Sequence, residues 1–411
     1  MVRRYDVAVV GLGVMGAMAA WQAARQGASV IGLDRFAPGH GLGSSHGGSR
    51  IFRMLLFEGA PYVSLARTSL GLFRQLEATS GAGLLDQCGG LLIGTRDGPA
   101  IAAARAAARL GGIDHRVLEG DALRARFPQH TLDEDELALY EPTAGVIRPE
   151  AAVRAAVAAA ATCGARIEPG ARCLALDEDG QGTVITTDTG VHRARTVILA
   201  AGCWTAGLLP DLALPLRPQR SVLTWFRPAA GGARAHGPAR FPVFVRRSGD
   251  RQGWGIPDVD GLGVKVGLSG PASPKRWLDR PEDNWTTPPA EAETAPVAAF
   301  VRRTLPGLLP AVASAQACMD GRTPDGHFVV GIPARRPGTV VCGGFAGHGF
   351  KHAPAIGLAA AQLALEGATE MPVGAFSPDR FERSERSGRP VRSDLGGRRA
   401  GPAPRSRGVH P

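Results

Sequence analysis

The chain has 411 residues, of which 44% are hydrophobic and 20% charged, so it has enough apolar residues for a sizeable core and is not disordered throughout. Its net charge of +10 arises largely in residues 380–411, where nine arginines stand against three acidic residues, so charge alone does not make the rest of the chain a nucleic-acid-binding protein. Because no segment has the roughly 20 apolar residues of a membrane-spanning helix, and because the six cysteines include no CxxC pair, we exclude a membrane span, a disulfide framework and a zinc site and expect a cytoplasmic protein.

The N-terminal segment has the pattern of a dinucleotide-binding unit. A buried strand over Tyr5–Val10 leads into Gly-x-Gly-x-x-Gly at residues 11–16, a helix follows over Ala17–Gln26, and a second strand over Ser29–Leu33 ends at an acidic residue. In such a unit the glycines allow a tight turn, close approach of the backbone to a pyrophosphate and close packing of helix on strand, and the acid accepts hydrogen bonds from ribose hydroxyls. A glycine-rich turn of another α/β protein is the alternative. The predicted contacts of an adenine dinucleotide are Gly11, Gly13, Gly16 and Asp34.

Further helices and strands follow a polar, glycine-rich loop at residues 39–53. The expected helices cover Tyr62–Glu77, Glu150–Cys163 and Pro354–Glu366. The expected strands cover Ala165–Glu168, Arg172–Leu176, Thr183–Thr187, Thr196–Ala200, Ser221–Phe226, Val243–Arg246, Gly263–Leu268 and Thr339–Cys342. Two segments rich in turn-forming residues are expected to be loops, Pro228–Ala239 and Thr286–Pro296. Strands of the nucleotide-binding fold occur at both ends and in the middle, which indicates that a second domain is inserted into the first.

The C-terminal residues 383–411 are rich in Arg, Gly, Pro and Ser and contain almost nothing apolar to bury. We expect them to form a disordered basic tail. A protein that binds nucleic acid through this tail is an alternative from another functional class, but the rest of the chain gives no reason to expect a nucleic-acid partner.

Lysine is rare in this chain: 44 of the 47 basic residues are arginine, and lysine occurs only at Lys265, Lys275 and Lys351. A surface ammonium can usually be replaced by a guanidinium at small cost, so a lysine that persists can mark a position that needs a compact charge with an adjustable pKa. For any one of the three lysines, retention by chance is an equal alternative, and the residues around each lysine have to distinguish the two explanations.

Seven ordered motifs between residues 4 and 382 resemble the monomeric sarcosine oxidase and N-methyltryptophan oxidase branch of the D-amino-acid oxidase superfamily. Besides the glycine fingerprint they are SHGGSRIFR at 45–53, EPTAGV at 141–146, GCW at 202–204, GLGVKVG at 261–267, CMDGRTPDGH at 318–327 and GFAGHGFK at 344–351. The resemblance implies an α/β (α+β) fold with a Rossmann-like FAD-binding domain and an inserted antiparallel-sheet substrate domain. The FAD-binding domain is expected to comprise residues 1–85, 141–215 and 322–382, and the substrate domain residues 86–140 and 216–321.

The resemblance also implies the cofactor FAD and the residues that hold it. Cys318 matches the cysteine that carries the flavin covalently in several relatives; such a thiolate needs positive charge nearby, and a small buried apolar residue is the alternative. Arg50 and His46 are expected against the flavin ring, and Lys265 is expected at its edge, where positive charge assists the reaction with oxygen. The remaining cofactor contacts that the resemblance implies are Met15, Arg35, Ser44, Cys173, Ala201, Gly202, Trp204, Gly344, Gly347, His348, Gly349 and Lys351.

By the same resemblance, Arg53 and Lys351 match the two cations that hold a substrate carboxylate. An internal salt bridge between Arg53 and Glu58 is the alternative. A metal site at His348 and His352 is not expected, because Gly349 and a nearby proline interrupt any helix and no carboxylate partner is evident.

The chain departs from monomeric sarcosine oxidases in the expected substrate pocket. Trp254 and Asp320 stand where the family has tyrosines, Leu56 replaces another tyrosine, and Ser269 replaces a histidine. Trp254 can still press a cation or an apolar group against its face. Asp320 has two readings: it accepts an amine or hydroxyl of a larger substrate, or it pairs with Arg322. A pocket changed in this way does not suit sarcosine itself.

We therefore expect a flavoprotein amine oxidase that oxidises the C–N bond of an amino acid with a secondary or cyclic amine to an imine, while O₂ is reduced to hydrogen peroxide. We nominate no general base, because binding can supply the unprotonated amine. The same-family alternatives oxidise a cyclic imino acid in secondary-metabolite biosynthesis or act as a dehydrogenase, and a nicotinamide-dependent dehydrogenase is a further alternative. The expected protein is a monomer whose partners are a small amino acid and O₂, with neither nucleic acid nor membrane.

Overall fold

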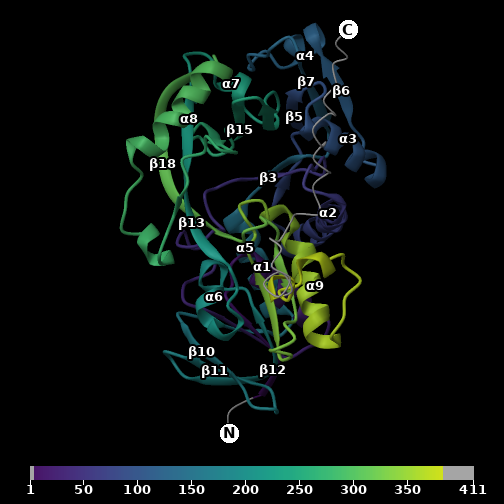
Figure 1. Cartoon of the computed structure of the whole chain (residues 1–411), viewed down its shortest axis with the longest axis vertical. Helices are drawn as coiled ribbons and strands as arrows, with labels where there is room; N and C mark the ends of the chain where they lie inside the picture. The colour runs from purple at the N-terminus through teal and green to yellow at the C-terminus, as the bar shows by residue number, and fades with distance from the viewer. Residues whose placement is uncertain (1–3, 383–411) are drawn as a thin grey trace, which may run out of the picture.

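The computed structural model describes residues 4–382, which fold around two large β-sheets (Figure 1). The predicted basic tail lies outside the described residues. The first sheet has eight strands: β1 (Arg4–Val10), β2 (Val30–Asp34), β9 (Arg166–Pro169), β10 (Cys173–Glu178), β11 (Thr183–Thr187), β12 (Val191–Leu199), β19 (Val329–Gly331) and β20 (Thr339–Gly343). Strands β9, β2, β1, β12 and β20 pair in parallel, whereas β10, β11 and β19 join the sheet through antiparallel pairs.

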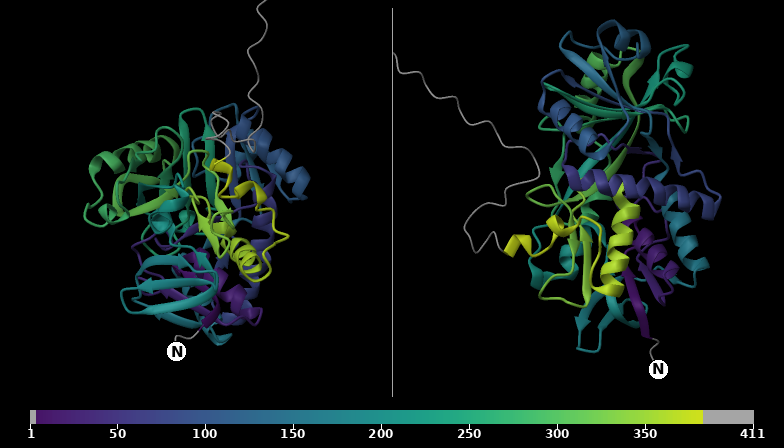
Figure 2. Two further views of the ribbon diagram at one scale, coloured as in Figure 1. Left: turned by 60° about the horizontal axis from the view of Figure 1, so that its bottom comes forward. Right: turned by 90° about the vertical axis from the view of Figure 1, so that its right-hand side faces the viewer.

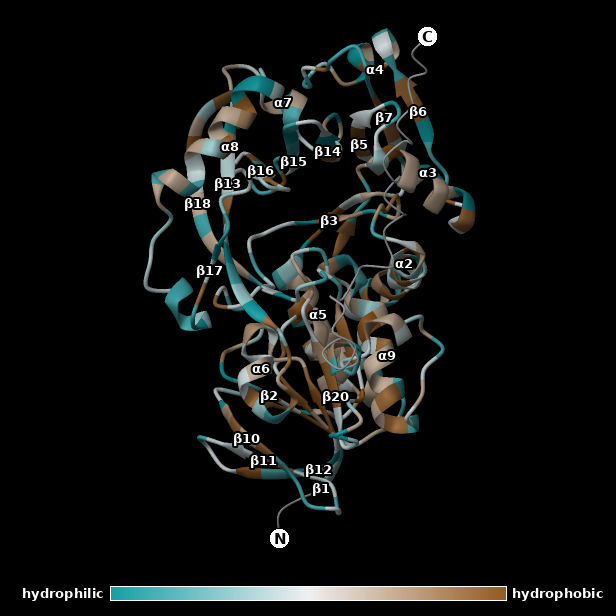
Figure 3. Ribbon diagram, viewed as in Figure 1, coloured by the Kyte–Doolittle hydropathy of each residue, from teal (hydrophilic) through white to brown (hydrophobic). Residues whose placement is uncertain are grey.

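Hydrophobic residues cover both faces of this sheet. Along β1, Val7 and Val9 pack into one cluster with residues of the helices α1 (Val14–Arg25), α2 (Ala60–Ser80), α5 (Pro149–Thr162) and α9 (Ala353–Glu366), whereas Ala8 and Val10 pack on the other face with residues of β10 and β11. The period of two is that of a strand, and burial of both faces is typical of parallel strands. Hydrophobic colouring accordingly concentrates on the strands around β20 and on α9 (Figure 3). The turn that follows β1 is therefore attached to a strand that is packed on both faces.

The second sheet has nine strands, and all of its neighbouring pairs are antiparallel except β5 with β14. Its strands are β5 (Gly90–Thr95), β6 (Arg116–Glu119), β7 (Glu136–Glu141), β13 (Arg217–Pro228), β14 (Val243–Ser248), β15 (Arg251–Ile256), β16 (Val264–Leu268), β17 (Arg276–Trp277) and β18 (Leu308–Arg322). The long strands β13 and β18 pair with each other and run from this sheet down toward the first one (Figure 1). Helix α2 crosses between the second sheet and α9 (Figure 2).

The remaining elements are a small sheet, five further α-helices and several 3₁₀ turns. A three-stranded sheet contains β3 (Arg50–Phe52), β4 (Leu85–Asp86) and β8 (Gly145–Ile147). The other α-helices are α3 (Pro99–Gly111), α4 (Gly120–Arg126), α6 (Thr205–Leu208), α7 (Ala233–His236) and α8 (Glu291–Thr304). Single 3₁₀ turns are η1 (Gly202–Trp204), η2 (Pro210–Leu212), η3 (Pro281–Asn284), η4 (Phe350–His352) and η5 (Gly374–Phe376). Within residues 4–382 the structure has no helix with the length and apolar character needed to cross a membrane.

The expected α/β fold with a largely antiparallel second sheet is confirmed, but both expected loops contain helix. The prediction of a loop over Thr286–Pro296 is wrong because α8 begins at Glu291 and includes Pro296. Proline removes one helical hydrogen bond, and the burial of Val297, Phe300 and Val301 against the second sheet stabilises the helix nevertheless. The expected loop at 228–239 likewise contains the single turn α7.

Candidate active site

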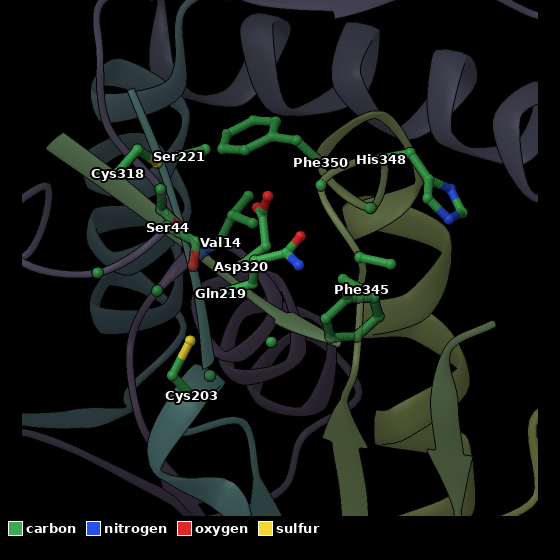
Figure 4. Close-up of a pocket in the computed structure, with 18 of the residues that line it drawn as sticks. Val14, Ser44, Cys203, Gln219, Ser221, Cys318, Asp320, Phe345, His348 and Phe350 are labelled. Atoms are coloured by element: carbon green, nitrogen blue, oxygen red, sulfur yellow. The ribbon is translucent and has the colours of Figure 1, made fainter. Parts of the chain in front are cut away.

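A cavity of about 1180 Å³ is lined by residues of both large sheets. Figure 4 shows part of it, with Cys318 and Ser221 on one side, Phe345 and His348 on the opposite side, and Asp320 between them. The predicted site residues that line this cavity are Gly11, Gly13, Met15, Asp34, Arg35, Ser44, Arg50, Arg53, Cys173, Ala201, Gly202, Trp204, Trp254, Lys265, Ser269, Cys318, Asp320, Gly344, Gly347, His348, Gly349 and Lys351. Gly16 and His46 do not line it.

The turn between β1 and α1 has no room for a Cβ at two of its glycines, Gly11 and Gly16. Gly11 has a φ of +91°, and a Cβ at this position would lie 2.6 Å from the carbonyl oxygen of Ala200. Gly13 is the N-cap of α1 and has no side chain of its own over this helix end, where Ser45 Oγ accepts a hydrogen bond of 3.0 Å from the amide of Val14; such a helix end favours a negatively charged group. A Cβ on Gly16 would lie 1.7 Å from the carbonyl oxygen of Gly11, so Gly16 permits packing of the helix on the turn, and it does not line the cavity. This cradle fits a pyrophosphate.

Asp34 fixes the same turn from the end of β2. Its Oδ2 accepts a hydrogen bond of 2.6 Å from the amide of Leu12, and its Oδ1 accepts one of 2.7 Å from the amide of Phe36. The side chain is buried and still lines the cavity. Because each carboxylate oxygen can accept more than one hydrogen bond, Asp34 can hold the turn and accept ribose hydroxyls at the same time.

A group of polar and aromatic side chains closes the cavity near Arg35. The Nη1 of Arg35 lies 2.9 Å from Oε1 of Glu282, and the same oxygen accepts a hydrogen bond of 2.8 Å from Nε1 of Trp204. Arg35 also lies over the ring of Trp285, 5.2 Å from its centroid. Glu282 was not predicted as a site residue, since 247 residues separate it from Arg35 and no motif marks it.

Cys318 is a buried free cysteine on β18, beside positive charge. Its Sγ lies 3.9 Å from Nη2 of Arg50, and Ser44 ties the neighbouring loop to β18 by donating a hydrogen bond of 2.6 Å to the carbonyl oxygen of Met319. Burial raises the pKa of the Cys318 thiol, while the charges of Arg50 and Lys265 act in the opposite direction. The structure thus places the predicted positive charge at this thiol.

Lys265 is fully enclosed on β16. Its Nζ donates hydrogen bonds to the carbonyl oxygens of Gly47 at 2.8 Å and Ser49 at 3.0 Å, and it lies 5.2 Å from the ring centroid of Trp225. Burial, with the nearby charge of Arg50, lowers the pKa of Lys265 well below its ordinary value. Burial and the nearby charges of Arg50 and Lys265 lower the pKa of His46 to about 4, so this imidazole is neutral near pH 7.

Of the two residues predicted to hold a substrate carboxylate, Arg53 is paired with a carboxylate of the chain itself, and among the described residues Lys351 is not. Nη2 of Arg53 lies 2.9 Å from Oε1 of Glu58, so the internal salt bridge is present, and Arg53 also donates to the carbonyl oxygen of Leu55. Nζ of Lys351 donates a hydrogen bond of 2.8 Å to the carbonyl oxygen of His348. Burial lowers the pKa of Lys351 to about 7, against the opposing effect of Glu58. Burial would raise the pKa of Glu58, but Arg53 and Lys351 lower it to about 2.

Four arginine and lysine residues that sequence reasoning did not assign to the site also line the cavity: Arg172, Arg247, Lys275 and Arg322. The rarity of lysine was the available signal for Lys275, and no signal marked Arg247. Asp320 has no ion pair with Arg322 among the described residues, so the predicted pairing of these two side chains is absent there.

Comparisons with known proteins agree with this geometry. The family model described as FAD dependent oxidoreductase matches residues 6–363. A monomeric sarcosine oxidase of Streptomyces avermitilis is 35% identical over 92% of this chain and 98% of its own length. An N-methyl-L-tryptophan oxidase of Yersinia pestis is 29% identical over 92% of this chain and 99% of its own.

Solved structures show the same fold. The open form of NikD, described as an unusual amino acid oxidase essential for nikkomycin biosynthesis, has a TM-score of 0.79 and 25% identity over 92% of this chain and 98% of that chain. An L-proline dehydrogenase from P. horikoshii has a TM-score of 0.79 and 20% identity over 93% of this chain and 99% of that chain, which is a likeness of fold alone.

Proposed function

Because the chain belongs to the FAD-dependent oxidoreductase family, as the sequence motifs predicted, we propose that it is a flavoprotein amine oxidase for an amino acid with a secondary or cyclic amine. The names of its relatives, sarcosine oxidase and N-methyl-L-tryptophan oxidase, support this class of substrate. The observation that carries the proposal is that Lys265, Cys318 and the cation pair Arg53 and Lys351 all line one cavity that begins at the glycine turn of β1.

The residues of the cavity fit FAD. The turn at Gly11 and Gly13 suits its pyrophosphate, Asp34 suits its adenosine ribose, and Cys318 is the position at which the flavin ring would be attached covalently. When bound, FAD supplies the capacity to take two electrons from a carbon–nitrogen bond and pass them to oxygen. The protein's part is to bind the substrate, exclude water and place charge.

The cations that line the cavity would have different tasks. Arg53 and Lys351 orient the substrate by its carboxylate, which also fixes the amine and the neighbouring carbon. Lys265, held in place by two carbonyl oxygens, offers positive charge where negative charge develops on oxygen during its reduction. Trp254 adds an aromatic face to the cavity wall, against which an apolar or cationic part of the substrate packs.

A biosynthetic relative of the same type is the second candidate. The likeness to NikD favours it, as do the replacements at Trp254, Ser269 and Asp320, which change the pocket relative to a sarcosine oxidase. In this version the substrate is a cyclic imino acid rather than an N-methyl amino acid. Attachment of the flavin to Cys318, a monomeric state and a cytoplasmic location are further parts of the proposal.

The test is an aerobic screen of N-methyl and cyclic amino acids, both enantiomers of each, with hydrogen peroxide as the readout. The proposal predicts peroxide from at least one secondary amine and none from the corresponding hydroxy acids. Substrates that reduce the flavin anaerobically without giving peroxide in air would make the protein a dehydrogenase. A flavin-loaded protein that no amine reduces would overturn the proposal.

A further inference from the structure

Arg247, Lys275 and Arg322 form a basic cluster that the flavin and the carboxylate pair leave without a task. Arg247 lies on β14, Lys275 just before β17 and Arg322 at the end of β18, and all three line the cavity. Lys275 lies outside the family motifs, whereas Lys265 and Lys351 lie inside them. All three lysines of this arginine-rich chain nevertheless line the same cavity.

Strand geometry brings the members of this basic cluster to one wall. Cys318, Asp320 and Arg322 alternate along β18, so their side chains project from the same face. Gln219 of β13 pairs with Asp320 of β18 on one side and with Trp277 of β17 on the other. Lys275 directly precedes β17 and is therefore held near the same wall of the cavity. The cluster thus begins two residues beyond Asp320, on the strand that also bears Cys318.

The basic cluster has donors without acceptors. The Nε atoms of Arg247 and Arg322 are both buried without a hydrogen-bond partner, and none of the three basic side chains forms an ion pair within the described residues. Arg247 has one side-chain acceptor, Oε1 of Gln252 at 3.0 Å. Buried charged donors that lack acceptors are costly, and an anion that brings several acceptors removes that cost.

The charges of the cluster act on one another. Burial lowers the pKa of Lys275; Arg322 and Arg247 lower it further, and Asp320 opposes them. At Lys275 the opposing acidic side chain is thus Asp320, and at Arg247 it is Glu58, which is already paired with Arg53. The wall keeps an excess of positive charge.

The ring of Phe57 links this cluster to the carboxylate pair. The guanidinium carbon of Arg53 lies 4.6 Å from the centroid of this ring, and that of Arg247 lies 4.9 Å from it. Arg53 and Arg247 therefore contact the same phenyl ring, so a ligand that reaches both of these cations needs only a short spacer between its two anionic ends.

We propose that Arg247, Lys275 and Arg322 form a second anion site, which selects a secondary or cyclic amino acid whose side chain carries a second carboxylate. This inference rests on the proposed function, in which Arg53 and Lys351 bind the first carboxylate. The substrate class is thereby narrowed to short amino dicarboxylates, such as N-alkyl glutamates or cyclic imino acids whose ring carries a second carboxylate.

The first test compares N-methyl-L-glutamate with N-methyl-L-glutamine, which have nearly the same shape and differ in charge, on the flavin-loaded enzyme. The proposal predicts a kcat/KM higher for the acid by roughly tenfold or more. In Lys275→Gln and Arg322→Gln this ratio should fall toward one, and Lys275→Arg should retain most of it. Arg276→Gln is the matched control, because Arg276 is exposed next to Lys275 and does not line the cavity, so the ratio should stay at the wild-type value.

A second readout needs no turnover. Calorimetry should show that glutarate binds more tightly than butyrate and that Lys275→Gln removes the difference. Oxidation of both N-methyl amino acids with equal kcat/KM, together with equal binding of glutarate and butyrate, would overturn the second anion site and leave the proposed function standing. Lysine-dependent preference for glutarate in a protein that oxidises no amine would instead support the anion site and overturn the proposed function.

Discussion

Lys265, Lys275 and Lys351 share one physical property: burial in the cavity wall lowers the pKa of each. A guanidinium keeps its charge when it is buried, whereas an ammonium loses its proton far more readily. The positive charge of this cavity is therefore adjustable at the three lysines and fixed at the arginines. We expect the pH dependence of binding and of the oxygen reaction to report on the lysines.

Binding of a simple carboxylate should depend on the protonation of Lys351. Burial lowers the pKa of Lys351 to about 7, so the ammonium is present below that pH and is lost as the pH rises through it. The affinity for benzoate, measured from the flavin absorbance, should be highest below pH 7 and fall above it. Because a bound anion favours the ammonium form of Lys351, the pH at which half of the affinity is lost should lie above the pKa of the free enzyme. Lys351→Met should weaken binding and flatten the profile, and a wild-type affinity independent of pH from about 6 to 9 would contradict the assignment.

Replacement of Lys265 should separate the two halves of the reaction. Lys265→Met removes the enclosed positive charge beside Trp225, so the reaction of the reduced enzyme with oxygen should slow by about a hundredfold or more. Anaerobic reduction of the flavin by substrate should change much less, because the carboxylate pair remains. Stopped-flow spectroscopy measures both rates, and equal slowing of the two would remove the role assigned to Lys265.

Cys318 provides a test of covalent attachment. In Cys318→Ala the yellow colour should pass into the supernatant when the protein is precipitated with acid, whereas the wild-type pellet should stay yellow. Cys203→Ala is the matched control, because Cys203 is also a buried free cysteine that lines the cavity, and its pellet should stay yellow. Complete release of flavin from the wild-type protein would show that the bond to Cys318 does not exist.

At the scale of elements, the turns that contain motifs could be predicted from the sequence, whereas several strands that line the cavity could not. The fingerprint over β1, α1 and β2 was recognisable because strand, glycine turn, helix and acid follow one another within 34 residues. Strand β18 escaped prediction because much of Leu308–Arg322 is half-exposed and rich in small residues, which leaves little hydrophobic alternation. Helix α8 escaped it because Pro296 lies inside.

The packing of α1 on its glycine turn yields a prediction for stability. In Gly16→Ala the new methyl group meets the carbonyl oxygen of Gly11, a backbone atom that cannot move aside alone, so we expect a loss of about 1–3 kcal/mol and weaker retention of FAD. In Gly71→Ala, inside α2, a Cβ meets nothing within 4 Å, so a gain of roughly 0.5–1 kcal/mol is expected. Denaturant unfolding and flavin content measure both, and equal effects of the two substitutions would contradict the packing role of Gly16.

At the scale of the whole molecule, the cavity joins residues that the sequence cannot bring together by inspection. The motifs contain the glycine turn, Cys318 and both cations of the carboxylate pair, but the basic cluster forms only when the second sheet brings β14, β18 and the residue before β17 to one cavity. The pairing of Arg53 with Glu58 was foreseen only as an alternative, because five residues of separation allow it but do not require it. His46 is buried and does not line the cavity, and its expected contact with the flavin stays a prediction. The domain boundaries stay a prediction.

The most direct test of the account is the flavin spectrum of the purified protein during a single anaerobic addition of a substrate amino acid, followed by air. The account predicts a yellow protein that is bleached by the amine and regains its colour in air with one hydrogen peroxide released per flavin. A correctly folded protein that contains no flavin and cannot be loaded with FAD would contradict it.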